Sequence, residues 1–305
     1  MEIAVRHLKK SFKERVILND ISFKVNSGDI FGLLAPDGSG KTTLMQLLAS
    51  YLTPDQGEIL FNGIPYQKSR DRIKKRIGYL AESNPLFENM TVHEFLTYIA
   101  HLCRVPRYVI PTRIIDTLSI CSLEREKGLK IKNLSKGQKR MVGISQAIIN
   151  NPKVLLLDEP TAGLDPNQSE NIRKLIKKIA VGKTLIVASH QLTDIKELCD
   201  RVIIINKGLV VADGSREGLQ NDINDKDVIK LQLAPVSSNN AIVHLKQIEG
   251  IRSVEMKKEH FIITSDKESC IEEKIFNLCK ENGWYIKNLS PVRMSLEEIF
   301  RSYTK

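Results

Sequence analysis

A glycine-rich loop that includes a lysine and a threonine lies near the start of the chain, directly after an apolar run. The run is Ile30–Leu34, and the loop contains Gly38, Gly40, Lys41 and Thr42. In a strand, loop and helix of this kind, backbone N–H groups surround phosphate oxygens, the lysine reaches the β- and γ-phosphates, and the threonine hydroxyl binds Mg²⁺. The sequence therefore predicts a nucleoside triphosphate site. The residues expected to contact the phosphates, here called the phosphate loop, are Ala35, Pro36, Asp37, Gly38, Ser39, Gly40, Lys41, Thr42 and Thr43.

Two residues of the phosphate loop are expected to weaken nucleotide binding. Ala35 stands where the pattern G-x-x-x-x-G-K-[ST] has glycine. If the backbone there needs a positive φ, the alanine Cβ costs roughly 1–2 kcal/mol, whereas with a negative φ it costs almost nothing. Asp37 places an anion near a polyphosphate, and a like-charge pair about 4 Å apart repels by roughly 4 kcal/mol at an effective dielectric constant of about 20. Mg²⁺, Lys41 and solvent are expected to offset much of this repulsion.

Two further apolar runs end in residues that suit hydrolysis. Residues 154–157 are followed by the adjacent carboxylates Asp158 and Glu159. Asp158 is placed to hold the Mg²⁺ shell and Glu159 to polarise the attacking water. His190 follows the run at residues 184–188, at a strand end of the kind where ligands gather in open α/β sheets. Taken alone, the histidine is as compatible with a structural role as with a functional one.

The elements that must position these residues follow from the hydrophobic pattern. From residue 1 to about residue 218, β-branched runs alternate with amphipathic helical stretches, which is typical of an α/β fold with a largely buried sheet. Between about residues 83 and 151 the strand signals vanish and helical periodicity predicts a helical subdomain. The expected strands cover residues 3–5, 16–25, 30–34, 77–80, 154–157, 184–188 and 202–205.

A polar stretch from Gln220 to Asp227 interrupts this pattern and predicts a domain boundary. We therefore expect a nucleotide-binding domain over residues 1–220 and a small α+β domain over residues 221–305. The order β-α-β-β-α-β predicted for the second domain is the ferredoxin-like one. Its expected elements are strand 228–233, helix 239–247, strands 251–257 and 261–264, helix 267–280, strand 284–289 and a last helix over 295–303.

The stretch LSKGQ at residues 134–138, followed by an amphipathic helix, points to a family when taken with the phosphate loop and the paired carboxylates. Residues 1–218 resemble the ATP-binding subunit of ABC transporters, whose signature reads LSGGQ in most members. The resemblance implies a P-loop NTPase of the ABC cassette type, with a mixed sheet core and a helical subdomain. It identifies Asp158 and Glu159 as Walker B, residues 162–165 as the D-loop and His190 as the switch histidine.

The resemblance also implies a dimer that closes around its nucleotides. In this family two cassettes sandwich two ATP molecules head to tail, so that the signature of one copy faces the phosphate loop of the other. The positive end of the signature helix then meets the γ-phosphate only when ATP bridges the two copies, and loss of that phosphate opens the dimer. The implied cofactors are ATP and Mg²⁺, and the implied signature residues at the nucleotide are Ser135, Gly137 and Gln138.

Further roles carry over from the family by position. Phe12 matches the aromatic residue that stacks on adenine, although a core phenylalanine is the alternative. Residues 77–82 match the Q-loop, with Glu82 where most members have glutamine. The implied catalytic residues are Glu159, His190 and Glu82, and the implied metal ligands are Thr42, Asp158 and Glu82. The family's helical subdomain grips a cytoplasmic helix of the membrane subunit, for which Leu86, Phe87 and Tyr98 are the interface candidates.

Lys136 in the signature, Glu82 in the Q-loop and a tail that reads SLEEIF at residues 295–300 resemble the cassettes of bacterial ABC-2-type exporters. The tail is equally compatible with an amphipathic helix that closes the small domain through Leu296, Ile299 and Phe300. The function implied is an ATPase that forms a homodimer and drives a separate membrane permease, with export favoured over import.

Composition excludes several classes of protein and leaves two alternatives open. The 305 residues are 42% hydrophobic and 27% charged, which excludes disordered and collagen-like chains. No apolar run approaches the roughly 20 residues of a membrane-spanning helix, and we expect no secretory leader. Five scattered cysteines without a C-x-x-C pair argue against a disulfide framework and a zinc site. We therefore expect a cytoplasmic protein, and the resemblance to a transporter subunit implies that it is peripheral at the inner face of the cell membrane.

The first alternative is a soluble ABC ATPase that acts on ribosomes or nucleic acid, which the net charge of +10 allows. The chain shows neither the second cassette nor the long coiled coil of such relatives, so no nucleic acid partner is expected. The second alternative is a cassette with weakened hydrolysis, which Ala35 and Asp37 suggest.

Overall fold

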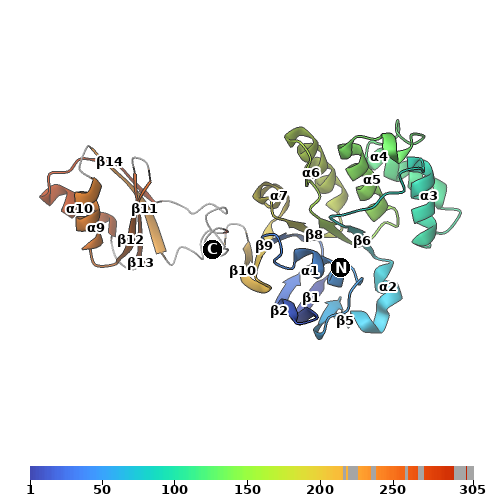
Figure 1. The fold of residues 1–305 in the computed structure, drawn as a ribbon, viewed down its shortest axis with the longest axis horizontal. Helices are drawn as coiled ribbons and strands as arrows, with labels where there is room; N and C mark the ends of the chain where they lie inside the picture. Colours follow the sequence, from blue (N-terminus) through green and yellow to red (C-terminus); the bar gives the residue numbers. More distant parts are fainter. Residues whose placement is uncertain are drawn as a thin grey trace. The chain divides into compact units, whose positions relative to one another are not determined.

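The computed structural model describes residues 1–215, 218, 226–234, 238–257, 260–266, 271–291 and 300. The chain divides into two compact units, Met1–Arg216 and Glu217–Tyr303, each with a sheet and a hydrophobic core of its own (Figure 1). None of the described helices combines the length and the apolar character needed to span a bilayer. The four cysteines within the described residues are free thiols.

A six-stranded sheet of order β10-β9-β3-β8-β7-β6 forms the centre of the first unit. The strands from β9 to β6 run parallel, and β10 pairs antiparallel with β9 at one edge. Because β7 and β8 are buried on both faces, their sequences are nearly continuous apolar runs, which is why they were predictable. The strands are β3 (Ile30–Leu34), β6 (Ile77–Leu80), β7 (Val154–Asp158), β8 (Thr184–Ser189), β9 (Arg201–Asn206) and β10 (Leu209–Ser215).

A second, antiparallel sheet of order β2-β1-β4-β5 shares its core with the first. Phe23 of β2 stacks on Phe31 of β3 with ring centroids 5.5 Å apart. The sequence predicted only residues 3–5 of β1, because the rest of that strand is mostly lysine, arginine and other half-exposed residues around the single buried Leu8. The strands are β1 (Ile3–Phe12), β2 (Arg15–Val25), β4 (Gln56–Phe61) and β5 (Ile64–Pro65).

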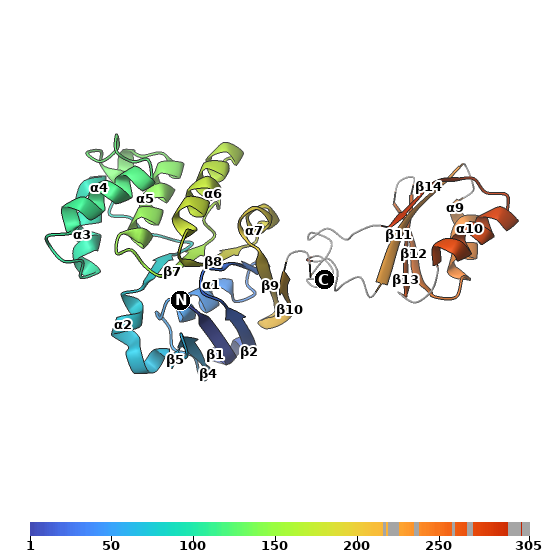
Figure 2. The same cartoon turned by 180° about the vertical axis from the view of Figure 1, so that it is seen from behind.

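Helices surround the six-stranded sheet, and three of them gather into the predicted helical subdomain (Figures 1 and 2). Thr91 begins the first of the three with a capping box, in which its hydroxyl accepts from the Glu94 N–H and the Glu94 carboxylate accepts from the Thr91 N–H. The subdomain helices are α3 (Val92–Leu102), α4 (Ile110–Ile120) and α5 (Lys136–Ile148), with the short η2 (Ile131–Asn133) before α5. The other helices of this unit are α1 (Lys41–Leu48), η1 (Tyr66–Ser69), α2 (Arg70–Lys74), α6 (Pro166–Ala180) and α7 (Leu192–Leu198).

The second unit has the predicted ferredoxin-like order. Its antiparallel sheet runs β12-β13-β11-β14, so each helical crossover skips one strand. Both helices lie on one face of the sheet in both views (Figures 1 and 2). The elements are β11 (Lys226–Leu233), α9 (Ser238–Lys246), β12 (Ile251–Lys257), β13 (His260–Asp266), α10 (Ile271–Glu281) and β14 (Ile286–Pro291). The predicted last helix over residues 295–303 lies, except for Phe300, outside the described residues, as do residues 220–225 of the predicted boundary.

Candidate functional site

The phosphate loop connects β3 to α1, as its residues predict. Gly40 caps α1 with a φ of 98°, and a Cβ there would stand 2.7 Å from the Leu18 side chain and 3.1 Å from the Ile17 carbonyl oxygen. Both the left-handed backbone and the close approach therefore require glycine at this position. Gly38, with a φ of 75°, gives the loop its other left-handed residue.

The two departures in the phosphate loop have different structural outcomes. Ala35 is buried and does not adopt a positive φ, so its Cβ brings no backbone penalty. Its carbonyl oxygen accepts a hydrogen bond from the Lys41 Nζ at 3.0 Å. Asp37 has a side chain 89% exposed and lies 3.6 Å from the same ammonium group, so solvent and Lys41 both screen its charge. The physical argument for weakened hydrolysis is correspondingly reduced.

Lys41, Glu159 and His190, which are far apart in the sequence, meet at the ends of neighbouring strands. The Lys41 ammonium lies 2.7 Å from the Glu159 Oε1, and His190 Nδ1 lies 2.9 Å from the same oxygen. The His190 backbone N–H also donates to this oxygen, at 2.8 Å, and the Ser189 hydroxyl donates to Oε2 at 3.3 Å. Glu159 is buried and has a φ of 48°, a left-handed conformation that is rare for a side chain of this size.

Asp158 has a very different environment from its neighbour Glu159. Its side chain is fully buried at the end of β7, and among the described residues neither carboxylate oxygen has a hydrogen-bond partner. Burial raises the pKa of Asp158 to about 7, and the negative charges of Glu82 and Glu159 add to this rise. Glu82 is in turn hydrogen-bonded by the Thr42 hydroxyl at 3.4 Å. The arrangement gathers acidic oxygens with one unpartnered carboxylate at the edge of the phosphate loop.

The signature residues lie at the start of α5 and are not joined to the phosphate loop of their own copy by any described hydrogen bond. The Ser135 hydroxyl accepts from the Gln138 N–H at 3.2 Å, and the Gln138 Oε1 accepts from the Ser135 N–H at 2.9 Å. This capping box explains why α5 begins where it does. A small cavity of about 130 Å³ beside it is lined by Ser135, Gly137 and Gln138 together with residues of α6. Ser135 itself is exposed.

Phe12 lies at the end of β1 with 46% of its surface exposed, so the alternative of a core phenylalanine is wrong. The Lys10 Nζ lies 5.5 Å from its ring centroid. The ring of Phe12 is therefore accessible at the end of β1, in keeping with its expected role of stacking on a base.

Two groups near the site were not found by sequence reasoning. The Arg140 guanidinium, on α5, hydrogen-bonds the carbonyl groups that follow β6 and end β7. The buried Asp194 accepts hydrogen bonds from Thr161 and, at 3.4 Å, from Ser189, and it pairs with Arg173 at 3.1 Å. It thus joins the segment after Glu159 to the segment before His190. The sequence signal that could have found Asp194 is an acidic residue in the first helical turn after the end of β8.

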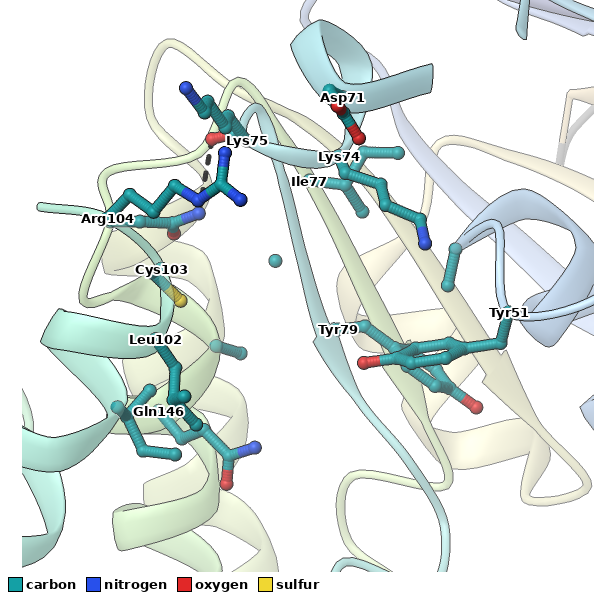
Figure 3. A pocket seen from close by; sticks show the side chains of 15 residues that line it. Tyr51, Asp71, Lys74, Lys75, Ile77, Tyr79, Leu102, Cys103, Arg104 and Gln146 are labelled. Carbon is teal, nitrogen blue, oxygen red and sulfur yellow. Dashed lines mark hydrogen bonds between the residues drawn. The ribbon is translucent and has the colours of Figure 1, made fainter. Parts of the chain in front are cut away.

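A larger cavity of about 410 Å³ lies beside β6, between that strand and the end of α3. Figure 3 shows Tyr51 and Tyr79 on one side and Leu102 and Cys103 on the other. Its basic lining residues are Lys74, Lys75 and Arg104, against the single acidic residue Asp71.

The three predicted interface candidates lie elsewhere on the helical subdomain. Leu86 lines a cavity of about 390 Å³ next to Glu82, and the exposed rings of Phe87 and Tyr98 pack edge to face at 5.5 Å.

Comparison with known proteins identifies the family. The ABC transporter family model matches residues 18–162, and the model of the ATP-binding protein DrrA1-3-like C-terminal domain matches residues 214–304. The Nod factor export ATP-binding protein I of Bradyrhizobium diazoefficiens is 32% identical over 232 residues, which cover 76% of each chain. The chain belongs to the ABC transporter ATP-binding proteins. The resemblance and the fold class predicted from its sequence are thereby confirmed, and the chain binds ATP as a member of a family of ATPases.

A further relative and a solved structure are also similar to this ABC protein. An uncharacterized ABC transporter ATP-binding protein of Nostoc sp. is 39% identical over 212 residues, which cover 68% of this chain and only 63% of that relative. A solved structure of a dimeric bacterial ABC transporter cassette superposes with a TM-score of 0.64 at 25% identity, and covers 70% of this chain and 98% of the cassette. The cassette fold thus corresponds to the first unit of this ABC protein.

Proposed function

We propose that this protein is the ATP-hydrolysing subunit of an exporter, in which two copies close around two ATP molecules and drive a separate membrane permease at the inner face of the cell membrane. The observation that carries the proposal is the contact of Lys41, Glu159 and His190 at the ends of neighbouring parallel strands. The name of the Bradyrhizobium relative refers to export, which supports the direction of transport.

Mg²⁺ fits the acidic edge of the site. Nucleotide-bound Mg²⁺ takes one or two carboxylates and completes its shell with phosphate oxygens and water. The described part of the chain contains no cluster of three or more His, Cys, Asp or Glu residues arranged to hold a metal without such help. Asp158, with two unpartnered oxygens, and the Thr42 hydroxyl are the proposed ligands, with Glu82 close to them. The ion would neutralise charge on the transferring phosphoryl group.

Glu159 is the proposed general base, and its partners explain how it is held and how it is released. Lys41 now contacts its carboxylate, and the same ammonium is the expected partner of the β- and γ-phosphates. An anionic triphosphate would compete for Lys41 and leave Glu159 free to accept a proton from the attacking water. His190 keeps the carboxylate oriented through its backbone N–H and its ring. Glu82 is the third proposed catalytic residue, through its contact with Thr42.

Base binding and closure involve two other surfaces. Phe12 is the proposed stacking partner of the adenine, since its ring is exposed at the end of β1. The N–H groups at the start of α5, with Ser135, Gly137 and Gln138, are the proposed contacts to the γ-phosphate bound by the second copy. The dimeric state of the similar solved cassette supports this assembly.

The permease is proposed to contact the helical subdomain and the cavity beside β6. The tyrosines and Leu102 offer an apolar floor, while Lys74, Lys75 and Arg104 outnumber Asp71 among the charged lining residues. A cytoplasmic segment of the permease with carboxylates around an apolar side chain fits that lining. Leu86, Phe87 and Tyr98 remain proposed contacts on the same subdomain, where Leu86 lines the cavity next to Glu82 and the rings of Phe87 and Tyr98 are exposed.

Replacing Glu159 by glutamine tests the hydrolytic part of the proposal. We expect Glu159→Gln to bind ATP, to lose turnover by roughly 100-fold or more, and to accumulate as a closed dimer. Turnover of Mg-ATP by the full chain and gel filtration with ATP measure the two effects. If the variant hydrolyses ATP at the wild-type rate, Glu159 is not the base.

Capture of a membrane protein tests the transport part. We expect the tagged full chain to co-purify a hydrophobic permease from detergent-solubilised membranes. Association with ribosomes that is lost on RNase treatment, with no membrane partner, would contradict it.

A further inference from the structure

Arg140 makes an unusual set of hydrogen bonds for a charged side chain, because all of its described acceptors are backbone carbonyl oxygens. Its Nε donates to the Pro160 oxygen at 2.9 Å, and its Nη2 donates to the Asp158 oxygen at 3.0 Å and also to the Glu159 oxygen. Its Nη1 lies 3.3 Å from the oxygens of both Ala81 and Glu82. One planar group thus joins the end of β7 to the segment that follows β6.

The guanidinium is well suited to this contact. It presents five N–H donors in a fixed plane, and an ammonium group cannot match that geometry. Burial lowers the pKa of Arg140, while the negative charges of Asp158, Glu159 and Glu82 oppose that shift. A partly buried cation is costly unless it is hydrogen-bonded, and here the cost is offset by carbonyl dipoles rather than by a carboxylate.

The contact with Glu159 bears directly on the conformation of the site. Glu159 adopts a left-handed backbone, and its peptide is held from both sides: its N–H donates to the Ala188 oxygen at 2.8 Å, and its carbonyl accepts from Arg140. A left-handed non-glycine residue persists only where the surroundings hold it. The Glu159 side chain that contacts Lys41 and His190 extends from this held backbone.

We propose that Arg140 is a positioning residue that couples the signature helix to the general base of the same copy. The proposal rests on the function proposed above, in which Ser135 meets the ATP bound by the second copy. Arg140 lies on the same helix, five residues after Ser135, so a shift of α5 on closure reaches the Glu159 peptide through one rigid element. Engagement of the signature at one ATP thus sets the geometry of hydrolysis at the other.

The neighbouring Lys139 provides a matched control. It is a basic residue of the same helix, but its ammonium pairs with Glu88 at 2.8 Å on an exposed surface. Lys139→Ala removes a positive charge from α5 without touching the ends of β6 or β7. A difference between the two variants therefore reports the carbonyl contacts rather than the net charge of the helix.

The test is ATP titration of Mg-ATP turnover by the full chain carrying Arg140→Lys, Arg140→Ala, Lys139→Ala or Glu159→Gln. For both Arg140 variants we expect kcat to fall by roughly 10- to 100-fold and the Hill coefficient to fall toward about 1. The dissociation constant of ATP, measured at protein concentrations below dimerisation, should stay within about threefold of wild type, and Lys139→Ala should match wild type within about twofold.

The outcomes separate this inference from the proposed function. If Glu159→Gln loses turnover while both Arg140 variants keep kcat and cooperativity, the inference is wrong and the proposed function stands. If Glu159→Gln retains turnover, the proposed base is wrong. If the Arg140 variants lose ATP binding in proportion to kcat, or unfold on a thermal scan, Arg140 is a structural residue only and the inference is overturned.

Discussion

The phosphate loop and the signature segment differ in how much of their binding chemistry one copy completes. The Lys41 ammonium is almost fully buried, with the Ala35 carbonyl and the Glu159 carboxylate as close partners. Ser135 is exposed, and its described hydrogen bonds close a capping box within its own helix. A buried, oriented cation is ready for an anion, whereas an exposed helix start binds one well only when solvent is excluded. We infer that one copy suffices to bind ATP and that two are needed to hydrolyse it.

Removing the buried ammonium of Lys41 is expected to have the largest effect, because it tests whether one copy binds ATP through the phosphate loop. Lys41→Ala would remove the charge-assisted hydrogen bonds proposed between this ammonium and the phosphates, and we expect ATP affinity to fall by roughly 10- to 100-fold. Binding to the single copy, measured by calorimetry with Mg-ATP, reports this loss. Lys139→Ala serves as the control, and an affinity for Lys41→Ala equal to that of the control would contradict the placement of the phosphate site.

A negative charge at Ser135 should leave the ATP affinity of the single copy almost unchanged and should prevent the ATP-dependent dimer from forming. Ser135→Glu places an anion where the second copy's γ-phosphate is expected, so the ATP-dependent dimer should be lost because like charges repel. Affinity of the single copy for ATP should stay within about twofold, since no described contact joins Ser135 to the phosphate loop. Light scattering with and without ATP measures the dimer, and Ser135→Thr, which preserves the cap, is the control. A dimer of Ser135→Glu as stable as that of the control would be the opposite result.

The smallest expected effect concerns the pH dependence of stability. The pKa of Asp158 is raised by burial to about 7 in the folded chain, above its unfolded value of 3.8. The unfolded chain therefore binds fewer protons between these values, and this group lowers the free energy of unfolding as pH rises from about 4 to about 7. Without Mg²⁺, Asp158→Asn should raise the melting temperature by a few degrees at about pH 8 and hardly at all at about pH 4.

Mg-ATP should reverse the order of the two melting temperatures at about pH 8, because the proposed Mg²⁺ ligand is the Asp158 carboxylate, which an amide does not replace. Thermal scans of both proteins at both pH values, with and without Mg-ATP, are sufficient. If the two proteins show the same difference in melting temperature at both pH values, the unpartnered carboxylate is not destabilising.

How far the sequence could predict the structure depends on burial. Strands β7 and β8 were found because both faces are buried, which leaves a continuous apolar run. Strands β4, β5 and β10 and most of β1 were missed, because exposed or half-buried residues make up at least half of each. The β-α-β-β-α-β order of the second unit was predicted because its strands and helices are short and regularly spaced.

The candidate site divides in the same way. The phosphate loop, Asp158, Glu159 and His190 are identifiable because each follows directly after a predictable strand. Arg140 acts through carbonyl groups 18 to 59 residues away in sequence, and Asp194 contacts Thr161, which is 33 residues away. The acceptors of Arg140 are backbone carbonyls, which leave no trace in residue types. Ala35 does not adopt a positive φ, and this too is a property of the folded loop that the sequence pattern does not show.

The most direct test of the two-copy site is a structure of the full-length Glu159→Gln protein with ATP and Mg²⁺. We predict a dimer in which the Ser135 hydroxyl of one copy lies within hydrogen-bond distance of a γ-phosphate oxygen whose other partner is the Lys41 ammonium of the second copy. A single copy that holds ATP with Ser135 exposed to solvent, in a protein whose wild type hydrolyses ATP, would contradict the account.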